Sequence, residues 1–254
     1  NGQTFSSHLT YGTTTHTLYG VLSMFSSQKW TNKAILNDSK IRDLIEHLSK
    51  RKLGNKDYPA DLMGDAYEIL LKKFADDSKA QAGEFYTPRS VVRLLVHILD
   101  PQPGETVYDP ACGSGSLLLK AEKILGKDAI RNGFYGQEIN ITTYNLCRIN
   151  MFLHDVGFDK FDIACEDTLL SPQHWDDEPF ELIVSNPPYS IKWAGDENPL
   201  LINDPRFAPA GVLAPKSKAD MAFIMHSLSW LASNGTAAIV CFPGIMYRSG
   251  AEQK

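Results

Sequence analysis

The sequence has no apolar run long enough to cross a membrane. The best candidate, Val91 to Leu99, is short and is interrupted by Arg93 and His97, whereas a membrane-spanning helix needs about 20 mostly apolar residues. The N-terminus also lacks the basic and then apolar pattern of a secretory signal peptide. We therefore expect a cytoplasmic protein that has no contact with a membrane.

Cysteine and positive charge are also scarce. The four cysteines, Cys112, Cys147, Cys165 and Cys241, lie far apart and form no Cys-x-x-Cys pair, so they fit neither a disulfide framework nor a zinc site. We expect no metal. The 25 Lys and Arg residues against 30 Asp and Glu residues give a net charge of −5. A mildly acidic chain of this kind contacts DNA only through a local basic patch or a basic partner.

The chain of 254 residues has the length of one large domain, or of one domain with an appendage. Apolar residues at helical spacing predict two helices near the N-terminus, one over 38–52 capped by Asp38-Ser39 and one over 60–75. We expect residues 1–80 to be a helical segment, part of a larger helical domain, although the first twenty residues show no periodicity. The polar stretch 76–83 is the expected boundary with a catalytic domain over 81–254.

After Gly83, short apolar runs alternate with amphipathic stretches. Strands are expected at 106–108, 134–136, 161–165, 182–184 and 236–242, and helices at 87–99, 116–125, 142–154 and 219–232. Thr87 is the expected N-cap of the first of these helices, with Pro88 in its first turn. The alternation predicts an α/β fold with a doubly wound, mostly parallel sheet, which binds ligands at the carboxyl ends of its strands. The chain stops soon after the last strand, so we expect this domain to be truncated at its C-terminal edge.

A glycine-rich loop, Asp109 to Ser116, joins the first strand to a helix. Its glycines allow a sharp turn and a close approach of a ligand, and the helix start offers free N–H groups. Leu118 stands where a dinucleotide-binding loop has a small residue, which disfavours a pyrophosphate. Asp109 adds a carboxylate suited to an amine, and Glu138 follows the next strand, where an acid can accept hydrogen bonds from ribose hydroxyls. Together they predict an S-adenosylmethionine site, against the plainer alternative of an ordinary turn with a solvated acid.

The segment Asn186-Pro187-Pro188-Tyr189 directly follows the apolar run 182–184. A simple chain-breaking turn is one interpretation. However, the two prolines fix the backbone and leave carbonyls without a nearby N–H partner. Beside the Asn186 side chain they form a cradle of acceptors for the two hydrogens of an exocyclic amine, and Tyr189 offers a flat face for stacking a base. We predict that Asn186, Pro187 and Tyr189 are the catalytic residues for methylating an amine of low basicity.

Two further sets of residues complete the expected site. Asp167 follows the third strand and could accept from the adenine amino group of the cofactor, although a helix or turn cap is the favoured explanation for this residue taken alone. The stretch 191–218 is too long for an ordinary connection. It carries Arg206, Lys216 and Lys218, for which we expect contact with DNA phosphates, with surface solvation as the alternative.

These motifs, taken together, resemble the modification (methyltransferase) subunit of type I restriction-modification systems, an adenine-specific DNA methyltransferase. The family's markers occur in its order and are Gly83-Glu84-Phe85-Tyr86-Thr87-Pro88, Asp109 to Ser116, Gly136-Gln137-Glu138 and Asn186-Pro187-Pro188-Tyr189. The resemblance extends from about Asp61 to Lys254. The Asn-Pro-Pro-Tyr motif is shared with protein-glutamine methyltransferases, whereas Glu-Phe-Tyr-Thr-Pro is much more specific.

The resemblance implies a Rossmann-like S-adenosylmethionine-dependent methyltransferase fold. The residues expected at the cofactor, from the motifs and the resemblance together, are Glu84, Phe85, Tyr86, Thr87, Pro88, Arg89, Asp109, Gly113, Ser114, Gly115, Ser116, Glu138 and Asp167. Asn186 and Tyr189 would hold an adenine flipped out of double-stranded DNA. The implied partners are a specificity subunit, a second modification subunit and, in the full complex, a restriction subunit. A protein-glutamine methyltransferase and a non-catalytic DNA-binding assembly subunit remain as alternatives.

Overall fold

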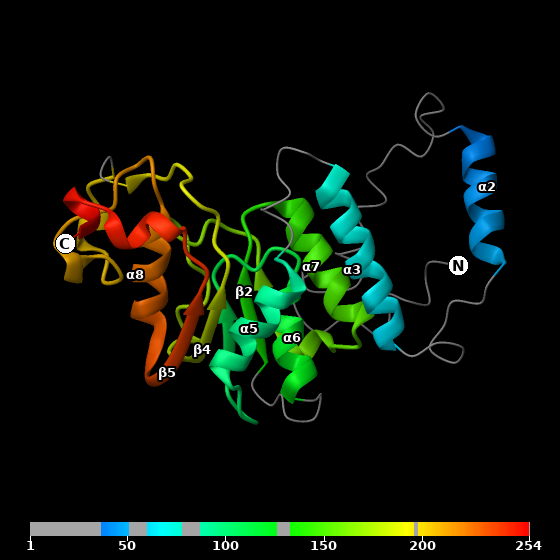
Figure 1. Cartoon of the computed structure of the whole chain (residues 1–254), viewed down its shortest axis with the longest axis horizontal. Coiled ribbons are helices and arrows are strands. Elements are labelled where there is room, and N and C mark those ends of the chain that lie inside the picture. Colours follow the sequence, from blue (N-terminus) through cyan, green and yellow to red (C-terminus); the bar gives the residue numbers. More distant parts are fainter. Residues whose placement is uncertain (1–36, 51–59, 78–86, 126–132, 196–197, 254) are drawn as a thin grey trace.

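A computed structural model describes residues 37–50, 60–77, 87–125, 133–195 and 198–253 (Figure 1). Its strands are β1 (Val107–Asp109), β2 (Phe134–Gln137), β3 (Phe161–Ala164), β4 (Phe180–Ser185) and β5 (Leu231–Ile239). They form one parallel sheet in the order β3-β2-β1-β4-β5. The chain moves outward from β1 to β3 and then returns to place β4 on the other side of β1. This reversal creates a crevice at the carboxyl ends of β1 and β4, where sheets of this kind bind ligands.

Helices cover both faces of the sheet. The α-helices are α2 (Asp38–Ser49), α3 (Ala60–Asp77), α5 (Arg89–Leu99), α6 (Ser116–Leu125), α7 (Ile141–Leu153) and α8 (Asp220–Trp230). Short 3-10 helices are η3 (Phe158–Lys160), η5 (Leu201–Asn203), η6 (Ala208–Ala210), η7 (Pro243–Tyr247) and η8 (Gly250–Gln253). Helices α5, α6 and α7 pack on one face and α8 packs on the other (Figure 1), which confirms the predicted doubly wound α/β architecture. None of the helices in the described part of the chain could span a membrane.

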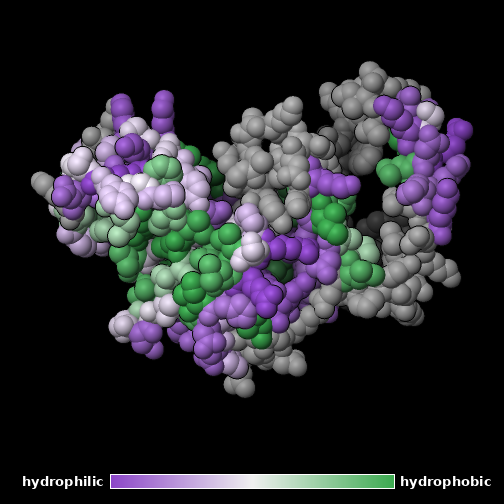
Figure 2. All heavy atoms as spheres, in the orientation of Figure 1, coloured by the Kyte–Doolittle hydropathy of each residue, from purple (hydrophilic) through white to green (hydrophobic). Residues whose placement is uncertain are grey.

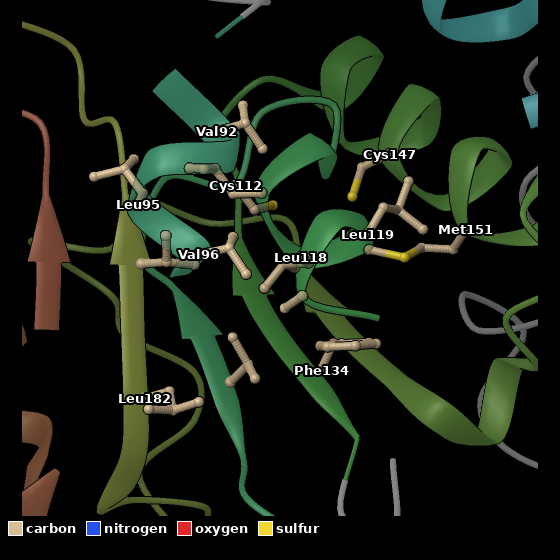
Figure 3. Close-up of a cluster of buried hydrophobic side chains, with 14 of the residues drawn as sticks. Val92, Leu95, Val96, Cys112, Leu118, Leu119, Phe134, Cys147, Met151 and Leu182 are labelled. Carbon is tan, nitrogen blue, oxygen red and sulfur yellow. The ribbon is translucent and has the colours of Figure 1, made fainter. Parts of the chain in front are cut away.

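The main core lies between the sheet and α5, α6 and α7 (Figure 3). Val96 of α5, Leu118 of α6 and Phe134 of β2 meet there and are fully buried. Burial of one such apolar side chain stabilises the fold by about 1.5–3 kcal/mol. On the opposite face, Tyr108 of β1 stacks on Phe180 of β4 with ring centroids 4.6 Å apart, and both belong to the cluster that includes Trp230 of α8. Helices therefore cover the central strands on both faces of the sheet. The crevice that can admit a ligand lies at the carboxyl ends of the strands.

The structure moves some predicted boundaries. The last strand begins at Leu231, immediately after α8, and ends at Ile239, because Leu231 already pairs with Phe180 across a register irregularity. Helix α2 is capped by Asn37, whose side-chain oxygen accepts from the Lys40 backbone N–H at 2.9 Å, rather than by Asp38 or Ser39. Helix α3 continues to Asp77, into the expected linker. Residues 1–20 and most of 76–83 lie outside the described residues, so the two-part domain division stays a prediction.

Candidate functional site

Three of the predicted site residues, Glu138, Asp167 and Asn186, line one cavity at the carboxyl ends of the strands. The cavity holds about 250 Å³ and lies among the segments that follow β1, β2, β3 and β4. Its lining residues are Pro110, Ala111, Gln137, Glu138, Ile139, Asn140, Asp167, Thr168, Leu169, Asn186, Pro188, Ile191, Lys192, Trp193 and Phe223. The glycine-rich loop, Glu138, Asp167 and Asn186 were predicted from four separate stretches of sequence, and the parallel sheet brings these stretches together.

The backbone of the glycine-rich loop requires glycine for a different reason from the one expected. Gly115 has a φ of +79°, in the left-handed region that favours glycine. A Cβ atom on Gly115 would lie 2.8 Å from Cys147 Sγ and 3.0 Å from Met151 Cε. Both atoms belong to α7 in the core and not to the cavity (Figure 3). A side chain at this position would therefore collide with α7, and binding of a ligand by the Gly115 backbone stays a prediction.

The rest of the loop is held by hydrogen bonds. Asn150 of α7 donates its side-chain N–H to the Ser114 carbonyl at 2.9 Å. The hydroxyls of Ser114 and Ser116 lie 3.1 Å apart, with Ser116 beginning α6. Gly113 has a φ of +53° and donates its backbone N–H to Glu138 Oε2 at 3.2 Å. The loop is thus fixed from the α7 side and from the end of β2.

Asp109 lies beneath the cavity and does not line it. The side chain is completely buried, and Oδ1 accepts from the Ala111 backbone N–H at 3.0 Å and from Ser185 Oγ at 2.9 Å. Burial raises the pKa of Asp109 to about 7, although these two hydrogen bonds act to lower it. Oδ2 is buried and has no hydrogen-bond partner within the described part of the chain. Asp109 therefore ties the end of β1 to the end of β4 and keeps one acceptor unsatisfied.

Glu138 is a fixed acceptor in the cavity wall. Its Oε2 accepts from Gly113 N and its Oε1 accepts from the Asn140 backbone N–H at 2.8 Å. The carboxylate thus joins the glycine-rich loop to the start of α7. Each carboxylate oxygen can accept more than one hydrogen bond, so the fixed group can still receive hydroxyl donors from a ligand.

Asp167 caps a turn and also lines the cavity. Its Oδ1 accepts from the backbone N–H groups of Leu169 and Leu170, at 2.9 and 3.3 Å, and so caps the turn after β3. The same residue lines the cavity. The neighbouring Thr168 hydroxyl donates to the Pro110 carbonyl at 2.6 Å, which fastens this turn to the glycine-rich loop.

The Asn186 amide is engaged at both ends. Its Nδ2 donates to Thr87 Oγ1 at 3.1 Å, and Tyr189 donates its hydroxyl to Oδ1 at 2.6 Å. Pro187 is buried, whereas Tyr189 is 44% exposed, so the tyrosine ring is accessible from outside. The prediction that Thr87 caps α5 is wrong, because Pro88 holds the cap position without a side-chain hydrogen bond and the Thr87 hydroxyl faces Asn186.

The remaining residues expected at the cofactor are more dispersed. Thr87, Arg89 and Ser116 line a second hollow between α3, α5 and α6, which hydrophilic side chains surround in Figure 2. Arg89 is exposed and forms an ion pair with Glu68 of α3 at 2.9 Å. The exposed Pro88 lines neither hollow. Glu84, Phe85 and Tyr86 lie outside the described residues.

Arg206 is buried inside the protein, contrary to the expectation that it lies at the surface in contact with DNA. It is 1% exposed. Its guanidinium donates to the Asp204 carboxylate at 2.7 and 3.0 Å, and to the carbonyls of Thr168 and Leu169 at 2.8 Å. The His226 ring nitrogen Nδ1 lies 3.2 Å from Nη1. All of its polar contacts are internal, so Arg206 fastens the loop after β4 to the turn after β3.

The two lysines remain candidates for a DNA contact. Lys216 is exposed, and Lys218 is half-buried and forms an ion pair with Glu252 at 3.7 Å. Sequence reasoning missed Lys192, Trp193 and Phe223, which line the cavity. Lys192 and Trp193 closely follow the Asn-Pro-Pro-Tyr turn, and this position in the sequence could have indicated that they line the cavity.

A separate group of possible metal ligands lies away from the cavity. Atoms of Asp162, His174 and Asp177 all lie within 4.8 Å of one another. The His174 ring bonds the Gly136 carbonyl through Nε2 at 3.0 Å and faces Asp177 through Nδ1 at 3.4 Å. The hydrogen bond to the Gly136 carbonyl and the contact with Asp177 account for the position of the ring, and none of the three residues lines the cavity.

Comparison with known proteins assigns the family. A model of the N-6 DNA methylase family matches residues 58–254. The methylase subunit of the type I restriction enzyme MpnII from Mycoplasma pneumoniae is 45% identical, over 90% of this chain and 44% of that protein. The HindI methylase subunit from Haemophilus influenzae is 32% identical, over 93% of this chain and 49% of that protein.

A solved structure agrees with these matches. The methyltransferase subunit of a type I restriction-modification system from Streptococcus thermophilus superposes with a TM-score of 0.80 at 36% identity, over 90% of this chain and 50% of that one. The chain thus has the Rossmann-like fold of S-adenosylmethionine-dependent methyltransferases, and it spans about half the length of the curated relatives it matches. With Glu138, Asp167 and the Asn186 turn assembled in one cavity, this chain belongs to the N-6 DNA methylase family.

Proposed function

We propose that this chain carries the catalytic site of a type I restriction-modification methylase, which transfers a methyl group from S-adenosylmethionine to the 6-amino group of adenine in DNA. The observation that carries this proposal is the position of the Asn186 amide in the same cavity as Glu138 and Asp167. An acceptor suited to an exocyclic amine thus lies beside acceptors suited to a nucleoside.

The cavity fits S-adenosylmethionine by the chemistry of its wall. Glu138 is held by backbone N–H groups in the cavity wall as an acceptor for ribose hydroxyls, and Asp167, which caps its turn through Oδ1, lines the same cavity. Ile139, Leu169 and Phe223 supply apolar surface for a base. When bound, S-adenosylmethionine supplies an electrophilic sulfonium methyl group.

The chain's own residues hold the target base in place. The adenine is flipped out of the duplex, because a stacked base does not offer its amino group in the required geometry. Asn186 Oδ1 and the Pro187 carbonyl accept the two amino hydrogens and so keep the nitrogen lone pair directed at the methyl group. Tyr189 stacks on the base. The nitrogen gains the methyl group as the sulfur–methyl bond breaks to leave S-adenosylhomocysteine, and it releases one proton to water. Because this step needs no strong base or metal, positioning supplies most of the rate.

A methylation experiment on the full-length protein, assembled with its DNA-reading partner, tests this function. Labelled S-adenosylmethionine is offered with unmethylated plasmid DNA and, separately, with a glutamine-containing protein, and the products are identified by mass spectrometry. We expect N6-methyladenine, which is lost in Asn186→Ala and retained in Asn234→Ala, an exposed asparagine in β5. Label in glutamine would support a protein-glutamine methyltransferase, and label in neither substrate would support a non-catalytic assembly subunit.

The proposed partners follow from charge and from the relatives. A net charge of −5 gives the chain little general affinity for phosphate, and reading a sequence requires side chains placed against base edges. We propose that a specificity subunit reads double-stranded DNA, that two modification subunits act with it, and that a restriction subunit joins the full complex. Lys216 and Lys218 are proposed to contact phosphates near the flipped base.

A further inference from the structure

Thr87 makes an unexpected contact with the catalytic turn. Its Oγ1 accepts from Asn186 Nδ2 at 3.1 Å, although the two residues are 99 positions apart in the sequence. The hydroxyl does not cap its own helix, because Pro88 takes the cap position. Within the described part of the chain, the Thr87 side chain has no other hydrogen-bond partner. Thr87 precedes α5 in the sequence position of a cap, but its side chain forms its hydrogen bond with Asn186 instead.

This contact matters because the two ends of an asparagine amide are not equivalent. The oxygen accepts hydrogen bonds, whereas the NH₂ group only donates them. An adenine amino group also donates, so it can pair with Asn186 only if Oδ1 faces it. Nδ2 then points away from the base and needs an acceptor on that side, because a half-buried donor without a partner costs free energy. Thr87 Oγ1 is this acceptor.

We propose that Thr87 is a positioning residue that holds the Asn186 amide with Oδ1 directed at the target amine. This inference rests on the proposed function, because it concerns the base that Asn186 would bind. The resemblance assigned Thr87 to the cofactor, and the structure instead joins it to the acceptor for the base.

The contact of Tyr189 with the same amide supports this role. Tyr189 donates its hydroxyl to Asn186 Oδ1 at 2.6 Å, and its ring is 44% exposed. The oxygen end of the amide thus already receives a donor from an accessible residue, in the place where an amino group of a base would bind. Pro187 and Pro188 fix the backbone that follows Asn186, so rotation of the amide about its own side-chain bonds is the main freedom left, and Thr87 restricts it.

Three variants in the full-length complex test the role of Thr87. Thr87→Val keeps the shape and removes the hydroxyl, Thr87→Ser keeps the hydroxyl, and Thr87→Ala serves if the valine variant does not fold. Calorimetry gives the affinity for S-adenosylmethionine, and kinetics with plasmid DNA give kcat and KM. We expect kcat to fall about 10-fold in Thr87→Val and Thr87→Ala, the effect of one lost hydrogen bond of about 1.4 kcal/mol. Cofactor affinity should change less than about 2-fold, and Thr87→Ser should stay within about 3-fold of wild-type kcat.

The possible outcomes separate the two levels of the proposal. If the wild-type complex methylates adenine and Thr87→Val is as fast, the positioning role is wrong and the proposed function stands. If Thr87→Val loses cofactor affinity in parallel with kcat, Thr87 holds the cofactor instead. If Thr87→Ser falls as far as Thr87→Ala, the hydroxyl is not the working group. A wild-type complex that methylates no adenine overturns the proposed function and this inference with it.

Discussion

Tyr189 contributes a hydroxyl and a ring to the site, and the two groups have opposite effects on the proposed binding of a base. The hydroxyl occupies Asn186 Oδ1, the atom proposed to receive the adenine amino group. The exposed ring offers the stacking surface, and stacking of a base on an aromatic side chain is worth about 1–3 kcal/mol. The hydroxyl would therefore compete with the proposed base for Oδ1, whereas the ring would support base binding.

Two substitutions of Tyr189 separate these effects. Tyr189→Phe keeps the ring and frees Oδ1, so we expect the KM for DNA to stay the same or to fall by up to about 3-fold. Tyr189→Ala removes the stacking surface, and we expect the KM to rise about 10-fold or more. Steady-state methylation of plasmid DNA by the full complex measures both. A phenylalanine variant as impaired as the alanine variant would show that the hydroxyl itself is needed for methyl transfer.

The buried carboxyl of Asp109 makes stability depend on pH. Burial raises its folded-state pKa from 3.8 to about 7. Between these values the folded state holds a proton that the unfolded state has lost, so the free energy of unfolding falls as pH rises from about 4 to 7. The difference of roughly three pH units corresponds to at most about 4 kcal/mol.

Asp109→Asn removes this dependence, because asparagine carries no charge and its Oδ1 can still accept from Ala111 and Ser185. We expect the variant to gain stability relative to wild type between pH 5 and pH 8, measured by chemical denaturation. Asp176→Asn, at an exposed position, is the matched control and should follow wild type. Parallel stability curves for wild type and Asp109→Asn would show that Asp109 is ionised in the folded protein without cost.

At the scale of elements, the sequence predicts what depends on local patterns. Helix α6 begins and ends at the predicted residues, because a glycine-rich turn precedes it and its apolar spacing is regular. Strand β1 differs from its prediction by one residue at each end. Neighbouring residues alone specify these features. The gathering of the motifs at one edge of the sheet can also be predicted, because a parallel sheet places the carboxyl ends of its strands together.

Features that depend on distant contacts could not be read from the sequence. The role of Gly115 follows from Cys147 and Met151 of α7, which only the packed structure places behind the loop. Thr87 has the sequence pattern of a helix cap, and its contact with Asn186 depends on the position of α5 beside the end of β4. Arg206 resembles a solvated basic residue in a polar loop, and its burial depends on carbonyls of the turn after β3.

Arg206 yields a prediction about the elements that it joins. Lysine has three donors on one nitrogen and cannot reproduce the guanidinium contacts with Asp204, Thr168 and Leu169. We expect Arg206→Lys to lower the free energy of unfolding by about 3 kcal/mol and to weaken cofactor binding, because the fastened turn carries Asp167. Lys216→Gln, at an exposed position, should leave stability within about 0.5 kcal/mol. If Arg206→Lys keeps full stability but loses DNA affinity, the assignment of Arg206 to the interior is wrong.

At the scale of the whole molecule, the proposed base-binding site is built into the framework of the parallel sheet. The cavity residues come from the turns after four parallel strands and from α8, and this part of the chain is held by a buried core on both faces. The DNA contacts proposed for this chain come from two lysines, Lys216 and Lys218, in the long segment that follows β4. Those lysines suit phosphates beside a flipped base, and phosphate contacts position a protein on DNA without identifying the bases.

The chain should therefore bind its cofactor alone but methylate a defined site only with a partner. We expect the full-length protein, purified without partners, to bind S-adenosylmethionine by calorimetry and to give negligible site-specific N6-methyladenine. Addition of the specificity subunit should restore methylation at one sequence, because that subunit supplies the contacts with base edges that the acidic chain lacks. Sequencing that maps methylated adenines on plasmid DNA measures this directly, with Asn186→Ala in the same complex as the inactive control. Efficient methylation of one defined sequence by the unpartnered protein would place the recognition element in the full-length protein itself and would refute the partner requirement.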